Sequence, residues 1–203
     1  MASKIRATLV VFFCFLALSS SAFAASVLPL GLERLHGDAK LIFLGECLSN
    51  SVALDQQSGR VVTYTTFEVL ETFKGKTGRS HTIKQIGGKL PDANLSVRIS
   101  GVPQFEVGQR YVVFLPPASK LGFSSPVGLS QGMFTMKTDD KGAQVVSNGR
   151  DVGDLMENMA QSKMPSLVAD KLRAMPDKEL PANAKARAEM PLDDLRSILR
   201  GLE

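Results

Sequence analysis

Hydrophobic residues change their spacing once along this chain, close to Asp151. Before this residue, apolar side chains alternate with polar ones or form short runs between clusters of Gly, Pro, Asn and Asp, as is typical of β-strands and turns. After it, Val152, Leu155, Met156 and Met159 recur at helical spacing. We therefore expect a β-rich part followed by a helical part, without βαβ alternation.

The β-rich part contains six segments with strand patterns. The second segment is the clearest, because it is rich in β-branched and aromatic residues. Six short strands separated by turns favour a mainly β fold, a small OB-like barrel, with a β-sandwich as the alternative and a helical appendage at the C-terminus. The expected strands are residues 41–48, 61–73, 81–86, 110–115, 132–138 and 144–147.

The N-terminus has the pattern of a signal peptide. Two basic residues precede an unbroken apolar run, residues 9–18, and small residues follow it. We expect residues 1–24 to be removed by cleavage before Ala25, and the protein to be exported to the periplasm or secreted. The apolar run is about half of the roughly 20 residues that a membrane-spanning helix needs, so we expect no stable membrane insertion after cleavage.

Cleavage would leave 179 residues with 22 basic and 20 acidic side chains, a net charge of +2 that favours no particular partner. We expect a β-barrel domain over residues 25–150 and a helical C-terminal region over residues 151–203, with a polar linker near residues 176–190. Cys47 would be the single remaining cysteine, so an intramolecular disulfide is excluded.

The last helix is expected to begin after Pro191. Leu192, Leu195, Leu199 and Leu202 form one apolar stripe along it. Such a stripe needs an apolar surface to cover, which either the same chain or a partner could supply.

Two motifs resemble catalytic or phosphate-binding signatures. Gly128–Gly132 fits G-x-S-x-G around Ser130, but the residues after it have a strand pattern and no histidine follows, so we interpret it as a glycine turn. Gly75-Lys76-Thr77 resembles the end of a phosphate-binding loop. The glycine required five residues earlier is replaced by Leu70, and a turn is again expected.

No complete catalytic, metal or cofactor site is expected. Cys47 could form a thiol pair with His36 or His81, but it shares a strand face with Leu41 and Phe43, which predicts a buried thiol. Zinc needs three or four ligands at local spacing, which the sequence lacks. We expect a protein that is not an enzyme.

A basic stretch between Glu71 and Asp92 contains no acidic residue. On an OB-like barrel it would cover one strand and the loops beside it, where such folds bind oligonucleotides and oligosaccharides. A solvated basic face is the ordinary interpretation, and binding of an anionic polymer is the alternative. The candidate ligand-binding residues are Lys74, Lys76, Arg79, Lys84 and Lys89.

Several local patterns together resemble a group of uncharacterised exported bacterial proteins. They are Phe67-Glu68-Val69 followed by Lys74-Gly75, Gly101-Val102-Pro103-Gln104-Phe105 followed by Gly108 and Tyr111–Leu115, Gly128–Gly132 followed by Phe134, and Pro191–Leu202. The resemblance covers most of the chain after residue 24. It implies a fold, and no activity is attached to the group.

The strand order and the phrase Leu44-Gly45-Glu46-Cys47 are similar to OB barrels of the netrin and metalloproteinase-inhibitor type. This resemblance implies a protease-inhibitor-like module. Those inhibitors use an N-terminal cysteine and several disulfides, and a chain that starts near Ala25 has neither.

The leading hypothesis is an exported, non-enzymatic interaction module of the cell envelope or exterior. Its expected partner is another envelope or extracellular protein. Binding of an anionic polymer and a protease-inhibitor-like module are the alternatives, and an enzyme is a third hypothesis.

Overall fold

The computed structural model of the chain describes residues 28–91, 93, 95–157, 159, 163–175 and 188–203. The expected signal peptide, residues 1–24, lies outside this part, as does most of the expected linker at residues 176–190. Among the described residues, no helix combines the length and the apolarity needed to cross a membrane.

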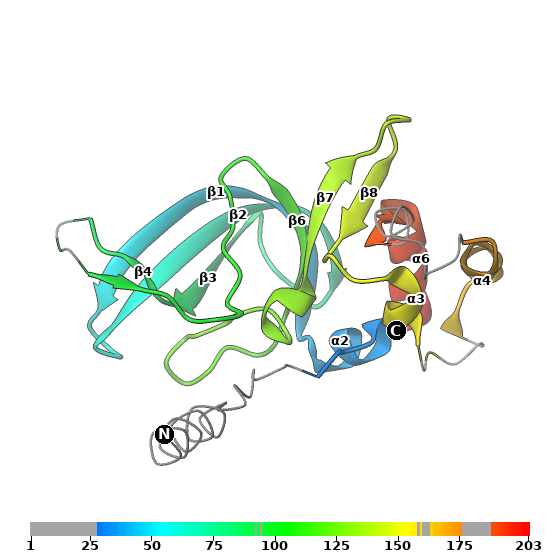
Figure 1. The fold of residues 1–203 in the computed structure, drawn as a ribbon. Helices are drawn as coiled ribbons and strands as arrows, with labels where there is room; N and C mark the ends of the chain where they lie inside the picture. The colour runs from blue at the N-terminus through cyan, green and yellow to red at the C-terminus, as the bar shows by residue number, and fades with distance from the viewer. Residues whose placement is uncertain (1–27, 92, 94, 158, 160–162, 176–187) are drawn as a thin grey trace, which may run out of the picture.

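Two strands of fifteen residues, β1 (Leu41–Asp55) and β2 (Arg60–Lys74), form a long antiparallel hairpin (Figure 1). On the two sides of this hairpin, β3 (Ser80–Ile86) pairs with β2, and β6 (Arg110–Leu115) pairs with β1. β1 continues beyond the predicted segment 41–48, because pairing with β2 satisfies the backbone of its polar second half.

Antiparallel pairing extends the sheet through β7 (Met133–Thr138), β8 (Gln144–Ser147) and β9 (Met190–Pro191). The resulting seven strands lie in the order β3-β2-β1-β6-β7-β8-β9. A small second sheet joins β4 (Gly88–Lys89) to β5 (Ser96–Val97). The predicted hairpin of segments 132–138 and 144–147 is confirmed as β7 and β8.

The mainly β fold with a helical C-terminal region is confirmed, but the sheet is not closed into a barrel. Its outermost strands, β3 and β9, pair with β2 and β8 and not with each other. Among the described residues, the secondary structure after β8 is helical except for β9, which adds two residues at the β8 edge and does not pair with β3. The expected barrel closure is therefore corrected, and the open sheet is consistent with the sandwich alternative.

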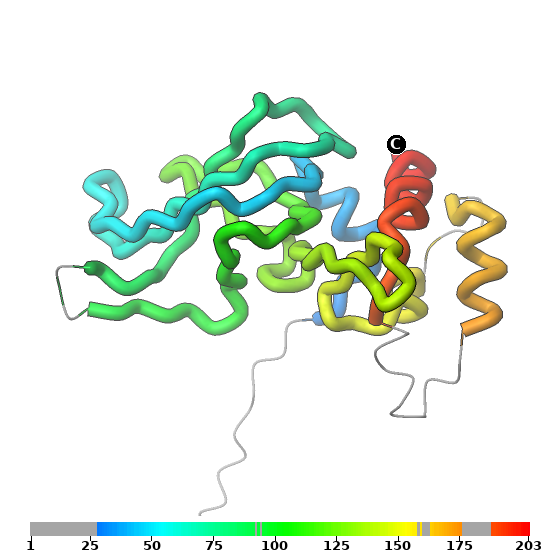
Figure 2. The backbone as a smooth tube through the Cα atoms, turned by 90° about the horizontal axis from the view of Figure 1, so that it is seen from above, coloured from blue at the N-terminus to red at the C-terminus, as the bar shows by residue number. Residues whose placement is uncertain are grey.

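The four α-helices of the described residues gather at one end of the sheet, beyond β7 and β8 (Figures 1 and 2). They are α2 (Leu32–Asp38), α3 (Val152–Met156), α4 (Ser166–Arg173) and α6 (Leu192–Gly201). Apolar side chains from all four join one core with residues of β1, β6, β7 and β8. The stripe of the last helix therefore covers a surface of its own chain.

Both faces of β6 and of the first half of β1 are buried, which explains the continuous apolar sequences there. In β6, Val112 and Phe114 face the helices, whereas Tyr111 and Val113 face a second core on the opposite side of the sheet. This second core includes Phe67 of β2. It extends along the β1–β2 hairpin toward the end of the sheet that is distant from the helices.

Candidate functional site

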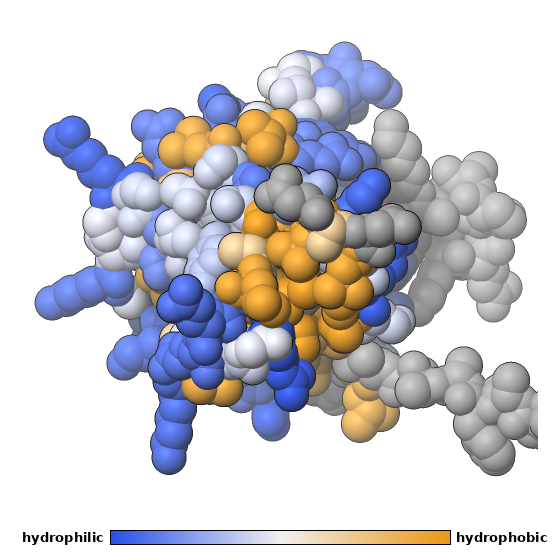
Figure 3. Space-filling model, turned by 90° about the vertical axis from the view of Figure 1, so that its left-hand side faces the viewer, coloured by the Kyte–Doolittle hydropathy of each residue, from blue (hydrophilic) through white to orange (hydrophobic). Residues whose placement is uncertain are grey.

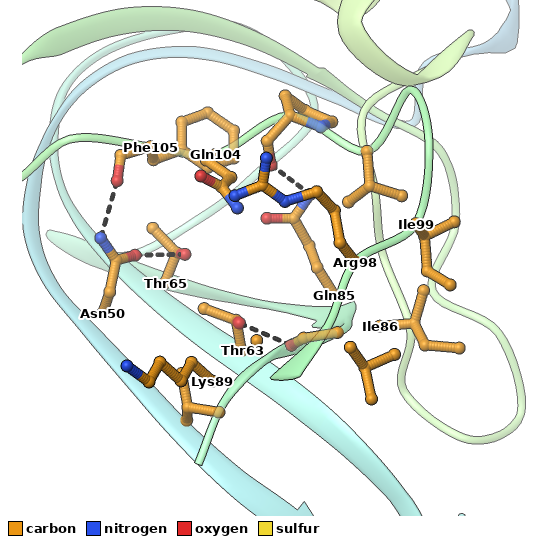
Figure 4. Close-up of a pocket in the computed structure, with 16 residues that line it drawn as sticks. Asn50, Thr63, Thr65, Gln85, Ile86, Lys89, Arg98, Ile99, Gln104 and Phe105 are labelled. Atoms are coloured by element: carbon orange, nitrogen blue, oxygen red, sulfur yellow. Dashed lines mark hydrogen bonds between the residues drawn. The ribbon is translucent and has the colours of Figure 1, made fainter. Parts of the chain in front are cut away.

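A pocket of about 240 Å³ lies between the inner face of β1–β3 and the described parts of the connection from β3 to β6, residues 87–91 and 95–105 (Figure 4). Its floor is polar and its walls are largely aliphatic. The floor consists of Asn50 from β1, Thr63 and Thr65 from β2, and Gln85 from β3, while the aliphatic walls consist of Val52, Ile86, Val97, Ile99 and Val102.

The polar floor continues the second core along the same strand faces. Side chains two residues apart point to the same face of a strand. Thr65 therefore shares the inner face of β2 with Phe67, and Gln85 shares the inner face of β3 with Ile83. Phe105 lies at the boundary between the second core and the pocket. It lines the pocket and packs edge-on against Phe67, with ring centroids 5.0 Å apart. The inner face thus changes from apolar to polar where the pocket begins.

Hydrogen bonds hold the floor residues in place. The Thr65 hydroxyl donates to Oδ1 of Asn50 at 2.6 Å, and Nδ2 of Asn50 donates to the carbonyl of Phe105 at 2.7 Å. The Thr63 hydroxyl donates to the carbonyl of Gly87 at 2.7 Å, and Nε2 of Gln85 lies 3.4 Å from the carbonyl of Pro103. The strands are thereby tied to the connection that covers them.

Two cations and an amide stand at the mouth of this pocket. Lys89 follows the turn after β3, and Arg98 and Gln104 belong to the covering connection. All three side chains are exposed, and in Figure 4 Arg98 extends from its loop over the pocket. Within the described part of the chain, no carboxylate pairs with Lys89 or Arg98.

Two glycines allow the covering connection to approach the sheet. Gly87 and Gly88 have φ of 100° and 136°, a region that residues with a Cβ rarely adopt. A Cβ on Gly88 would lie 2.7 Å from side-chain atoms of both Thr63 and Val52, and a Cβ on Gly87 would lie 2.7 Å from the carbonyl of Val97. The sequence indicated a strand end here, and the structure adds this close approach.

The predicted basic stretch is divided by the fold. The ammonium of Lys74 donates to the carbonyl of His36 at 2.6 Å, near the end of α2. Lys76 and Arg79 are exposed in the turn between β2 and β3. Lys89 follows the other end of β3, which at about 3.3 Å per residue places it about 20 Å or more from the turn. Lys89 is the member of the stretch that lines the pocket.

Lys84, the fifth predicted residue, is 8% exposed and lies on the outer face of β3. Its ammonium lies 2.8 Å from Oδ2 of Asp55, donates to the carbonyl of Leu121 at 2.8 Å, and stands 4.7 Å from the ring centroid of Phe123. These contacts use the cation within the chain, so Lys84 is not offered to a ligand.

The carboxylate of Asp55 accepts further hydrogen bonds from its neighbours. Oδ1 accepts from the hydroxyl of Tyr64 at 2.8 Å, and Oδ2 accepts from the backbone and hydroxyl of Ser58. Hydrogen bonds from Lys84, Ser58 and Tyr64 hold the pKa of Asp55 well below its usual range. The bond to Asp55 in turn raises the pKa of Tyr64. These hydrogen bonds and the ion pair with Lys84 connect the tip of the β1–β2 hairpin to β3.

The motif residues lie in structural positions. Ser130 is exposed in the short helical turn η1 (Leu129–Gly132), and β7 follows directly, as the glycine-turn interpretation predicted. Cys47 is buried in the second core, which confirms its predicted inward face, and burial raises the pKa of its thiol. No group of three or more possible metal ligands occurs in the described ranges.

Sequence reasoning did not identify the pocket floor. Thr63 and Thr65 lie in register with the inward-facing Val61 and Phe67, and this polar pair at apolar positions was the available signal. Thr65 is 1% exposed and Gln85 is 3% exposed. The contributions of Asn50, Arg98 and Gln104 carried no comparable signal, because polar residues at strand ends and in loops are ordinary.

Together the fold and the pocket define an open antiparallel β protein with a small polar pocket under a loop. A comparison with protein families and with curated proteins finds no match to the chain.

Proposed function

We propose that this chain is an exported, non-enzymatic interaction module of the cell envelope or exterior, and that it binds through the pocket under residues 87–105. The observation that carries the proposal is the combination of a hydrogen-bonded polar floor, in which Thr65 and Gln85 are buried, with two cations at the mouth that pair with no described carboxylate. A small concave site with convergent polar groups is the usual form of a binding site.

The polar floor has a cost in stability. Each hydroxyl or amide in it loses its hydration on folding, and its hydrogen bond within the protein returns a net stabilisation of only about 0.5–1.5 kcal/mol. Val or Leu at Thr65 and Gln85 would extend the second core at no such cost. Because Thr65 and Gln85 lie where an apolar side chain would stabilise the fold more, a role in binding accounts for them.

The pocket mouth also adjoins exposed apolar side chains. Ile99, which lines the pocket, is 40% exposed, and Leu54, 59% exposed, lies on the same face of β1 as Val52 of the pocket wall. Figure 3 shows an apolar patch on this end of the molecule. Contiguous apolar surface of this kind is typical of interaction sites.

A pull-down with matched charge reversals tests the proposal. The purified protein, the pocket variant Lys89→Glu with Arg98→Glu, and the control variant Lys76→Glu with Arg79→Glu are immobilised and exposed to envelope extract. Both variants change the net charge equally and alter exposed side chains. We expect the natural protein and the control to retain the same component, and the pocket variant to lose it.

Other outcomes of that pull-down would contradict the proposal. Retention by the pocket variant and loss by the control would favour the basic stretch instead. Equal retention by all three proteins would exclude both sites. Chemical conversion of the retained component by the natural protein would contradict the non-enzymatic role.

The anionic-polymer alternative is favoured by Lys76 and Arg79, which are exposed together in one turn. The pocket is preferred because Lys74 and Lys84 already contact backbone carbonyls. Polymer binding by exposed cations should weaken steeply as the salt concentration rises. Binding in the pocket, which adds neutral hydrogen bonds and apolar contacts, should depend less on salt.

A further inference from the structure

The hydrogen bonds of the pocket floor have a fixed direction. The carbonyls of Phe105 and Gly87 can only accept, so the amide nitrogen of Asn50 and the hydroxyl of Thr63 must donate to them. Oδ1 of Asn50 is then an acceptor, and the Thr65 hydroxyl must donate to it. Each threonine has therefore used its one proton within the protein.

The floor thus offers acceptors to a ligand. Lone pairs remain on the hydroxyl oxygens of Thr63 and Thr65, and Nε2 of Gln85 faces Pro103, which leaves the Gln85 carbonyl oxygen as a further acceptor. In Figure 4 the Gln85 side chain points from β3 into the pocket. A group that enters the pocket deeply can therefore donate to these oxygens and accept from the second N–H of the Asn50 or Gln85 amide, and a hydroxyl does both.

The mouth of the pocket has the opposite character. Lys89 and Arg98 can only donate, and both carry a positive charge. The guanidinium of Arg98 suits a carboxylate, which it can bind through two parallel hydrogen bonds. A ligand that matches both ends has hydroxyl groups at its inner end and an anionic group at its outer end.

Size and wall chemistry narrow the ligand further. A volume of about 240 Å³ lies below the usual range of about 300–1,000 Å³ for drug-sized ligands, so the pocket suits a single ring. Aliphatic walls from Val52, Ile86 and Ile99 suit the C–H face of such a ring. A sugar ring has both a C–H face and a set of hydroxyls.

Resting on the proposed function, we propose that the group bound in the pocket is one acidic sugar residue, a hydroxylated ring that carries a carboxylate. Its hydroxyls donate to Thr63, Thr65 and Gln85. Its carboxylate lies between Lys89 and Arg98. The partner of the module is then a uronic-acid-containing glycan of the envelope or exterior.

Titration of the purified protein with small probes, followed by NMR of backbone amides, tests this ligand class. The probes are D-galacturonate, its neutral counterpart D-galactose, acetate, and a capped Gly-Glu-Gly peptide. We expect galacturonate to shift amides of the pocket residues at a lower concentration than each of the other three probes. Galactose lacks the carboxylate, whereas acetate and the peptide lack the ring hydroxyls.

Variants assign the two ends of the ligand. Arg98→Gln should weaken galacturonate binding about tenfold or more and leave the weak binding of galactose unchanged, since it removes a charge-assisted contact. Thr63→Val should weaken both sugars. The control Arg79→Gln removes an equal charge in the β2–β3 turn and should change neither affinity.

Several results would overturn the acidic-sugar assignment. Equal affinity for galacturonate and galactose would show that the cations take no part. Tighter binding of the peptide would assign the pocket to an acidic protein segment. No pocket shift with either sugar would exclude this ligand class. The pull-down tests the proposed function separately, because it asks only whether the pocket variant loses the retained component. Each of these results would exclude the acidic sugar and leave the proposed function standing.

Discussion

The ammonium of Lys84 lies 2.8 Å from the carboxylate of Asp55, and both side chains are about nine-tenths buried. Asp55 ends β1 and Lys84 is near the end of β3, two strands separated in the sheet by β2. The ion pair therefore crosses β2 and fixes the outer part of the hairpin, which forms the pocket floor. The contribution of this ion pair can be measured as a change in the free energy of unfolding.

Asp55→Asn should reduce the dependence of stability on acid. The folded-state pKa of Asp55 lies below its unfolded value of about 3.9, so its contribution is fully present above pH 5 and is lost as pH falls through the folded-state pKa. We expect the natural protein to lose more free energy of unfolding than Asp55→Asn between pH 5 and pH 2. Urea unfolding at stepped pH measures this, and equal losses would contradict the role of the pair.

His36→Leu should stabilise the protein, most strongly at mildly acidic pH. Nε2 of His36 is buried, and no described residue bonds to it. Burial, followed by the charge of Lys74, lowers the pKa of His36, although Glu203 opposes this shift and Lys163 adds to it. As pH falls below about 6.5, His36 becomes protonated in the unfolded chain but stays neutral in the folded chain. The free energy of unfolding therefore decreases.

We expect His36→Leu to gain about 1 kcal/mol at pH 7 and more at pH 5.5. His81, whose pKa burial also lowers, retains part of the slope in the variant. Thermal unfolding at both pH values checks this prediction. A variant less stable than the natural protein at pH 5.5 would show that the imidazole has a stabilising partner.

Gly45→Ala should destabilise the sheet, whereas Gly37→Ala should not. A Cβ on Gly45 would lie 2.8 Å from the carbonyl of Glu68 and 2.8 Å from the ring of Phe43, inside the packed sheet. We expect a loss of about 1–3 kcal/mol, measured by urea unfolding. Gly37 is in α2 with no atom near its Cβ position, so Ala there should gain about 0.5–1 kcal/mol.

Leu195→Ala tests whether α6 belongs to the core of the domain. Leu195 is fully buried in the cluster beside β8, so its truncation should cost about 2–5 kcal/mol. Leu167 in α4 is 63% exposed, and Leu167→Ala should change stability by less than about 0.5 kcal/mol. A small effect at Leu195 would show that the last helix is separable from the sheet.

Local patterns predicted the β-strands and helices well. The segments 81–86, 110–115 and 144–147 correspond closely to β3, β6 and β8, because alternation and turn residues depend on backbone geometry over a few residues. The same patterns did not predict the second half of β1, because the expected strand ended at residue 48 and β1 ends at Asp55. There the polar residues resemble a loop until β2 is placed beside them.

The sequence by itself therefore determined the position of most strands, although not the second half of β1 or the short strands β4, β5 and β9, together with the inward thiol of Cys47 and the helical end of the chain. Tertiary structure decided the open sheet, the burial of Lys84 against Asp55, and the pocket. Asn50, Thr65 and Gln85 meet because the registers of β1, β2 and β3 align them. Register and closure depend on packing between distant segments, which no local pattern records.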